Sequence, residues 1–163
     1  MVAGRTTFNA PWSWELKASS LIGLLAVGVP IISLVVRGGF VVATLLSGVI
    51  LTLMCRAVRG YEVTPGVLLV RRLLWTTRVP LPKPVVTRVQ PRAMAGSWRL
   101  WGNGGFFAFS GHFSNAVLGR YRAFVTDMAR TVVLTTAQGA IVVSPDDPHE
   151  FVRAVTVATD AVS

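Results

Sequence analysis

The residues that most directly suggest chemistry are three glycines in four positions, Gly102, Gly104 and Gly105. The backbone amides of a glycine-rich loop can cradle a phosphate, but such a loop follows a strand and opens a helix. Here the glycines precede an aromatic, extended run at residues 106–109. An Asn-Gly pair is preferred at the centre of a two-residue hairpin turn. The spacing therefore favours a β-hairpin with its turn at Asn103-Gly104 over a phosphate-binding loop.

The other reactive side chains form weak patterns. Ser110, His112 and Asp127 supply the residue types of a hydrolytic triad, but no nucleophile-elbow sequence accompanies them. His149 has no partner at a metal-ligand spacing. The aspartates at 146–147 are typical of helix capping. We therefore expect no catalytic, cofactor-binding or metal-binding residues, no cofactor, and a protein that is not an enzyme.

Charge and composition narrow the classes of partner. The 163 residues include 16 Lys and Arg against 7 Asp and Glu, a formal net charge of +9, and 52% are hydrophobic. A strong positive charge can indicate nucleic acid, but no basic run exceeds Arg71-Arg72 and no nucleic-acid-binding motif is present. We predict no nucleic-acid partner, because arginines facing anionic lipid explain the charge better. The single cysteine, Cys55, excludes an intramolecular disulfide.

Two apolar runs predict a hairpin of transmembrane helices. Residues 18–36 are nineteen amino acids without a charge, close to the length that crosses a hydrocarbon core of about 30 Å. Residues 38–55 add eighteen more, and Arg37 alone stands between the runs, so the helices must be antiparallel. A cleaved signal peptide is the alternative for the first run, which is long for one and lacks a convincing cleavage site.

The residues that flank the runs predict the orientation of the hairpin. Cations gather before the first run and after the second, with Arg37 alone at the turn, so both termini are expected in the cytoplasm. Trp12, Trp14, Lys17 and Arg56 are predicted to anchor the hairpin at the headgroup level. The chain is therefore expected in the cell membrane, with two spans.

The interior of the runs predicts an anchor. Small residues at four-residue spacing would let the helices approach closely: Ser19 with Gly23 in the first run, and Ala43 with Ser47 and Thr44 with Gly48 in the second. Neither run contains an ionisable residue, so neither supports an ion or proton pathway.

From Ala57 onward, short extended segments alternate with turn signals. Turns are expected at residues 65–66, 73–74, 82–84 and 138–139. About seven strands fit into roughly ninety residues, which indicates a small antiparallel barrel or sandwich.

The last segment changes to a helical period. Asp147 is predicted as the N-cap, Pro148 suits the first helical position, and Glu150 completes a capping box. One C-terminal amphipathic helix is therefore expected to close the β-rich part.

This order of elements resembles the pleckstrin-homology-like (PH-like) fold. The N-terminal hairpin and the segments YEVTPGVLLVRR, GNGGFF, LGRYRAFVTD and IVVSPDDPHEFV resemble more narrowly a family of bacterial PH-like membrane proteins. The resemblance implies an α+β protein with a two-helix transmembrane hairpin, then an antiparallel β-barrel or sandwich of about seven strands capped by one helix. It implies a membrane location but no established activity. The turn at residues 64–66 is shorter than the first hairpin loop of phosphoinositide-binding PH domains.

Three regions follow from these patterns. Residues 1–17 are predicted as an N-terminal interfacial segment, residues 18–56 as the transmembrane hairpin, and residues 57–163 as the PH-like domain.

A binding surface is predicted from strand alternation around the expected turn. Four side chains would face the core: Trp98, Leu100, Phe107 and Phe109. The arginines of the domain are either a solvated sheet face or a basic binding surface. The candidate surface consists of Arg99, Trp101, Phe106, Arg120 and Arg122. The alternative for Trp101 and Phe106 is that the chain's own loops or helix cover them.

The predicted function is a membrane-anchored PH-like module that binds or scaffolds, presenting a basic and aromatic surface to lipid headgroups or to a protein partner. The alternative is an accessory subunit that packs its spans against a larger membrane protein complex. Membrane lipids are the expected partners of the two spans. The identity of a protein partner and the oligomeric state stay open.

Overall fold

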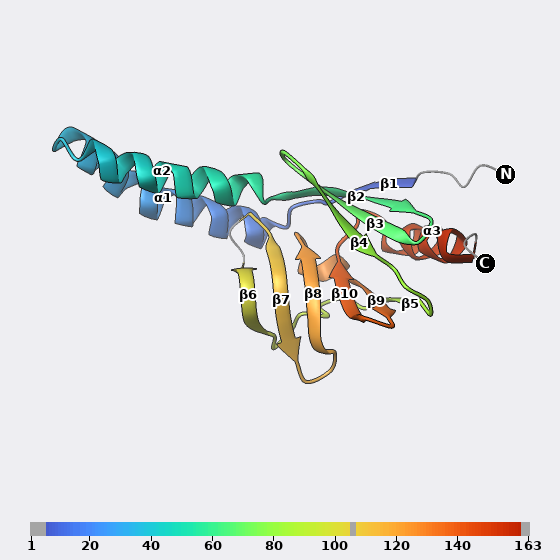
Figure 1. Ribbon diagram of the computed structural model, residues 1–163. Coiled ribbons are helices and arrows are strands. Elements are labelled where there is room, and N and C mark those ends of the chain that lie inside the picture. The colour runs from blue at the N-terminus through green and yellow to red at the C-terminus, as the bar shows by residue number, and fades with distance from the viewer. Residues whose placement is uncertain (1–5, 105–106, 161–163) are drawn as a thin grey trace.

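The structure is a computed structural model that describes residues 6–104 and 107–160. Two apolar helices extend from a domain of two β-sheets, and a third helix lies at the other end of that domain (Figure 1). The helices are α1 (Trp14–Val36), α2 (Phe40–Cys55) and α3 (Pro148–Asp160). The described residues form ten strands: β1 (Thr6–Asn9), β2 (Val58–Thr64), β3 (Val67–Arg72), β4 (Thr76–Pro80), β5 (Val86–Val89), β6 (Trp98–Gly104), β7 (Phe109–Asn115), β8 (Gly119–Val125), β9 (Val132–Thr136) and β10 (Gly139–Val143).

The first helix, α1, is long and apolar enough to cross a membrane, whereas α2 has 16 residues. At 1.5 Å per residue α2 is about 24 Å long, which is less than a hydrocarbon core of about 30 Å. The prediction of two spans is therefore supported for α1 alone. The second run appeared longer in the sequence because it includes Gly38 and Gly39. The structure places Gly38, with a φ of 81°, in the connection, and Gly39 at the N-cap of α2.

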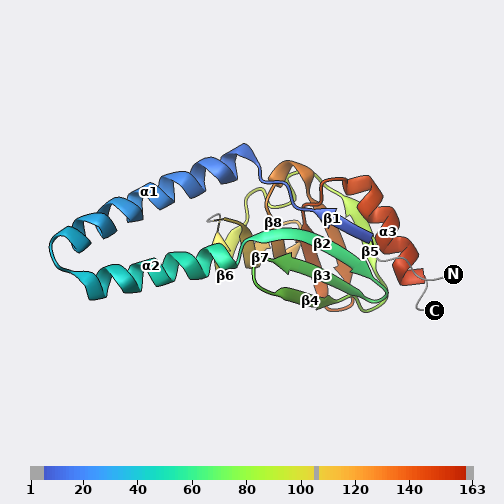
Figure 2. The same cartoon turned by 90° about the horizontal axis from the view of Figure 1, so that it is seen from above.

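The two apolar helices approach each other at their connection and diverge towards the domain (Figure 2). Ala43, in the first turn of α2, is buried. A side chain added at Gly28 or Gly48 would meet nothing within 4 Å. The close approach predicted from the spacing of Thr44 and Gly48 is therefore absent at Gly48.

The strands form two sheets that pack face to face. The first sheet has the order β1-β2-β3-β4, and the second has the order β5-β9-β10-β8-β7-β6. Neighbouring strands are antiparallel except β8 and β10, which are parallel. The α+β class and the C-terminal helix are confirmed, although the described strands number ten instead of about seven. The additional strands include β1, which lies within the segment predicted to be interfacial and pairs with β2.

The main core lies between the sheets and is closed by α3. Phe8 and Tyr61 of the first sheet pack edge-on against Phe151 of α3, at ring-centroid distances of 5.1 and 6.1 Å. The Tyr61 hydroxyl donates to the carbonyl of Phe124 (2.5 Å) and accepts from the amide of Ser144 (3.1 Å). Tyr61 therefore ties the two sheets together. Burial raises its pKa to about 12.

The start of α3 confirms the predicted cap. The Asp147 carboxylate accepts from the amides of His149 (3.0 Å) and Glu150 (2.9 Å), and these bonds lower its pKa. Asp146 has a different role, because its carboxylate accepts from the backbone and side-chain amides of Asn9, both at 3.2 Å. The two aspartates thus fix α3 and β1 at one edge of the domain.

The β6–β7 hairpin differs from the prediction. β6 continues through Gly104, which pairs with Phe109, so Asn103 and Gly104 lie in the strand and not in the turn. The physical reason is a contact distant in sequence: the buried Phe107, with a φ of 63°, donates its amide to the Ser20 hydroxyl of α1 at 3.0 Å. This contact holds Phe107 against α1, and the locally preferred turn does not form at Asn103-Gly104.

The change of register also moves the side chains predicted for the core. Trp98 and Leu100 are 80% and 51% exposed, so their assignment to the core is wrong. Phe107 is buried as predicted, and Phe109 is half-buried. A register shift between Arg99 and Trp101 interrupts the strand alternation on which that prediction depended.

Candidate functional site

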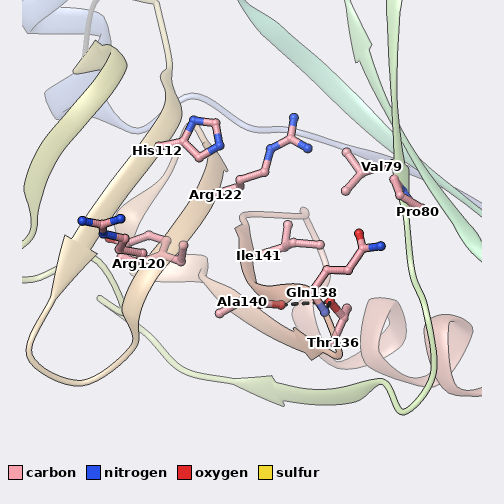
Figure 3. Close-up of a pocket in the computed structure, with 11 residues that line it drawn as sticks. Val79, Pro80, His112, Arg120, Arg122, Thr136, Gln138, Ala140 and Ile141 are labelled. Carbon is pink, nitrogen blue, oxygen red and sulfur yellow. Dashed lines mark hydrogen bonds between the residues drawn. The ribbon is translucent and has the colours of Figure 1, made fainter.

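An open groove lies between the edge of the first sheet and the inner face of the second (Figure 3). Val79 and Pro80 of β4 border one side, and β7, β8 and β10 form the other. The groove has a volume of about 240 Å³. Val79 and Ile141 are buried, so part of the groove lining is apolar.

Polar side chains line this groove from neighbouring strands. His112 of β7 pairs with Arg122 of β8, and Arg122 pairs with Ile141 of β10. Because paired residues share a face of the sheet, their side chains project to the same side. Figure 3 shows the His112 imidazole near the Arg122 guanidinium, with Gln138 reaching towards β4 from the β9–β10 turn. Arg120 lines the same groove but extends away from that pair.

A half-buried arginine, Arg72, bridges the two sheets beside the groove. From the end of β3 its guanidinium donates to the hydroxyls of Thr77 (3.0 Å) and Ser110 (2.8 Å), and to the carbonyl of Arg56. Burial lowers the pKa of Arg72, and the charges of Arg56 and Arg122 lower it further. Charges of one sign are therefore held close together at this point.

The ring of Phe124 contacts two of these cations. The guanidinium carbons of Arg72 and Arg122 lie 5.5 and 5.3 Å from its centroid, within the range of cation–π attraction. Among the described residues that line the groove there is no aspartate or glutamate. The groove is therefore cationic without a carboxylate in its lining, and it is chemically suited to an anion.

A second cluster lies where the helices leave the domain, and we call it the helix-side rim. A shallow depression of about 540 Å³ is lined by the end of α2 and by β6: Leu53, Arg56, Arg99, Leu100, Trp101 and Gly102. The exposed β3–β4 turn, residues 73–75, lies beside the same end of α2 (Figures 1 and 2). The rim comprises Leu73, Leu74, Trp75, Leu100 and Trp101 with Arg56 and Arg99.

The predicted surface residues fall into two connected groups. Arg99 and Trp101 line the rim, and Arg120 and Arg122 line the groove. Trp101, His112 and Arg122 then form one cross-strand row from the rim into the groove. Phe106 lies outside the described residues.

The predicted membrane anchors have different environments. Trp12 is half-buried, and its ring lies 6.1 Å from that of Phe107, so this side chain packs against the domain. Trp14 is 79% exposed, and Lys17 and Arg56 are also exposed. The last three remain available to a membrane surface.

Several residues of the site were not predicted from the sequence. His112, Gln138 and Arg72 enter it through strand register and through contacts between the sheets. The apolar tip at residues 73–75 could have been noticed, because the turn was predicted and its residues are large and apolar.

Two packed β-sheets closed by a C-terminal helix, with a long apolar helix ahead of them, define a PH-like domain that follows a candidate membrane helix. Comparison with family models matches the Bacterial PH domain family at residues 59–159, which is well over half of the chain. The chain belongs to this family, and the resemblance drawn from the sequence is confirmed. Comparisons with curated proteins and with solved structures give no match.

Proposed function

We propose that this protein is a membrane-anchored binding module whose PH domain lies against the membrane and contacts anionic lipid headgroups through its helix-side rim. The observation that carries this proposal is the position of the rim at the end of the domain from which α1 and α2 leave (Figure 1). Trp101 is 78% exposed there, beside Arg56 and Arg99. Aromatic rings next to arginines suit the boundary between headgroups and acyl chains.

The energies available at the rim support this contact. Full burial of a large apolar side chain contributes about 1.5–3 kcal/mol, and an arginine near anionic lipid about 1 kcal/mol. Because the domain is already tethered, the contact needs no free association from solution. A few such side chains are then enough to hold the domain at the surface.

The membrane anchor in this proposal is the hairpin of α1 and α2, with both termini in the cytoplasm. α2 is about 24 Å long, and a bilayer accommodates a short helix by local thinning or by snorkelling of flanking residues. Neither helix contains an acidic or basic residue between Ala18 and Val36 or between Phe40 and Cys55, so the hairpin acts as an anchor and not as a transport path. Catalysis forms no part of the proposal.

Spin labels on the full chain test the rim contact. In a Cys55→Ser background, a label at Trp101→Cys should be accessible to oxygen, which partitions into lipid, when the protein is in nanodiscs that contain phosphatidylglycerol. A matched control is Val157→Cys on α3, because Val157 is 70% exposed at the opposite end of the domain. That label should instead be accessible to a water-soluble nickel chelate.

Equal aqueous accessibility at both positions would exclude the lipid contact. Co-purification of the chain with a larger membrane complex would then favour the accessory-subunit alternative.

A further inference from the structure

The groove between the sheets lies outside the rim and shows features that a solvated sheet face does not require. Arg122 is half-buried, and it is held over the Phe124 ring with Arg72 on the same ring. Like-charged groups at close range destabilise a fold unless an opposite charge is near. No described residue of the groove lining supplies that charge, although the chain has 7 Asp and Glu. An anionic ligand would supply it.

The donors around the groove match a phosphate group. A guanidinium presents N–H groups in a fixed fork, an amide presents two donors, and an imidazole presents one or two. Arg122, His112 and Gln138 place these three kinds of donor around one opening, from β8, β7 and the β9–β10 turn (Figure 3). Val79 and Ile141 make part of the lining apolar, which strengthens hydrogen bonds to a charged ligand.

We propose that the groove binds the phosphate group of an organic phosphate, with Arg122 as the main ligand and His112 and Gln138 as flanking donors. The volume of about 240 Å³ fits a phosphate with a small organic substituent. The phosphate can belong to a lipid headgroup or to a soluble phosphomonoester, because both present the same chemistry. The site does not depend on the proposed contact between the rim and the membrane.

Histidine NMR on the full chain tests this site directly. The chain has two histidines: His112 lies in the groove, and His149 lies at the start of α3 and serves as an internal control. In maltoside micelles, which contain no phosphate, glycerol 3-phosphate should shift the ring resonances of His112 saturably and leave those of His149 in place. In nanodiscs, phosphatidic acid should shift His112 relative to phosphatidylcholine if the ligand is a lipid headgroup.

Two substitutions make the test specific. Arg122→Gln should weaken binding about tenfold or more, because it removes a charge-assisted hydrogen-bond pair. Arg78→Gln is the matched control, because Arg78 is exposed on β4 next to the groove-lining Val79 but does not line the groove. Circular dichroism should show the same fold for both variants, and Arg122→Lys, which keeps the charge, should weaken binding less than Arg122→Gln.

The arms of the experiment separate the outcomes. A His112 shift in the soluble arm identifies a phosphomonoester site. A shift confined to the nanodisc arm and lost in Arg122→Gln identifies a headgroup site in the groove, whereas one that persists in Arg122→Gln comes from the rim and counts against the groove. No shift in either arm would overturn the proposal. Equal shifts of His112 and His149, or equal losses in the Arg122 and Arg78 variants, would do the same. None of these results alters the accessibility expected at the rim.

Discussion

At the residue scale, Tyr61 is the side chain that most directly joins the two sheets. It is fully buried, and its hydroxyl bonds to the backbone of Phe124 and of Ser144. Tyr61→Phe would leave a buried carbonyl and a buried amide without this partner, which should lower the free energy of unfolding by about 1–3 kcal/mol. Urea unfolding of the full chain in maltoside micelles at neutral pH, followed by tryptophan fluorescence, measures this change.

The raised pKa of Tyr61 also predicts an alkaline dependence. In the unfolded chain the phenol ionises near pH 10, whereas in the folded protein its pKa is about 12. The unfolded state therefore loses its proton first, and stability should fall by about 2–3 kcal/mol as the pH rises from 10 to 12. In Tyr61→Phe most of this fall should disappear. An identical alkaline fall in both proteins would show that another group causes it.

The candidate site could be predicted in part at this scale. Arg120 and Arg122 were predicted because the sequence shows an excess of arginine over acidic residues. The structure places both in the groove lining. His112 could not be assigned, because its role depends on being paired with Arg122 across two strands. Arg72 joins them through a contact with Ser110, 38 positions along the chain. Strand register and long-range contacts cannot be predicted from the spacing of neighbouring residues.

At the element scale, the glycines of the β6–β7 hairpin have a steric role. Gly102 pairs with Gly111, and both have positive φ. A Cβ at Gly111 would lie 2.2 Å from the carbonyl oxygen of Trp101. Gly111→Ala should therefore separate the strands and destabilise the domain by about 2 kcal/mol or more. The midpoint of thermal unfolding and hydrogen exchange of the β6 and β7 amides would report this change.

A second glycine separates steric clash from backbone strain. Gly119 also has a positive φ, of 63°, but a Cβ there would meet nothing within 4 Å. Gly119→Ala should cost about 1 kcal/mol, from the backbone conformation alone. If both variants lost the same stability, close packing of β6 on β7 would not be the reason for the glycines.

The elements that were predicted correctly are those whose signals are local. The β2–β3 and β3–β4 turns, the Asp147 cap and the apolar helix α1 each depend on a few adjacent residues or on a continuous run. The β6–β7 turn was predicted at the wrong residues because Asn-Gly favours a tight turn, whereas Phe107 is fixed by Ser20 of α1. That contact joins segments 87 positions apart. A turn preference that depends on four adjacent residues could not reveal the contact between Phe107 and Ser20.

At the scale of the whole molecule, the orientation of the hairpin can be measured. In a Cys55→Ser background, a cysteine at Gly38 should react with an impermeant thiol reagent in intact cells, and a cysteine at Val157 should react only after permeabilisation. A side chain at Gly38 meets no neighbour within 4 Å, and its positive φ costs only about 1 kcal/mol, so this position accepts a probe. Protection of both positions in intact cells would show that α2 fails to cross. Reaction at Val157 alone would reverse the orientation.

The pairing of β1 with β2 makes the apolar hairpin an insertion within one sheet. β1 precedes α1, β2 follows α2, and the two strands pair from Thr6 with Val63 to Asn9 with Gly60. In the proposed membrane hairpin, β1 is synthesised before both helices, and it can pair only after both helices have crossed and β2 has been made on the same side. Completion of the first sheet would then depend on insertion of both helices. A chain in which only one of the two helices crosses would have β1 and β2 on opposite sides of the membrane, so Phe8 could not enter the core and β2 would be left as an open sheet edge.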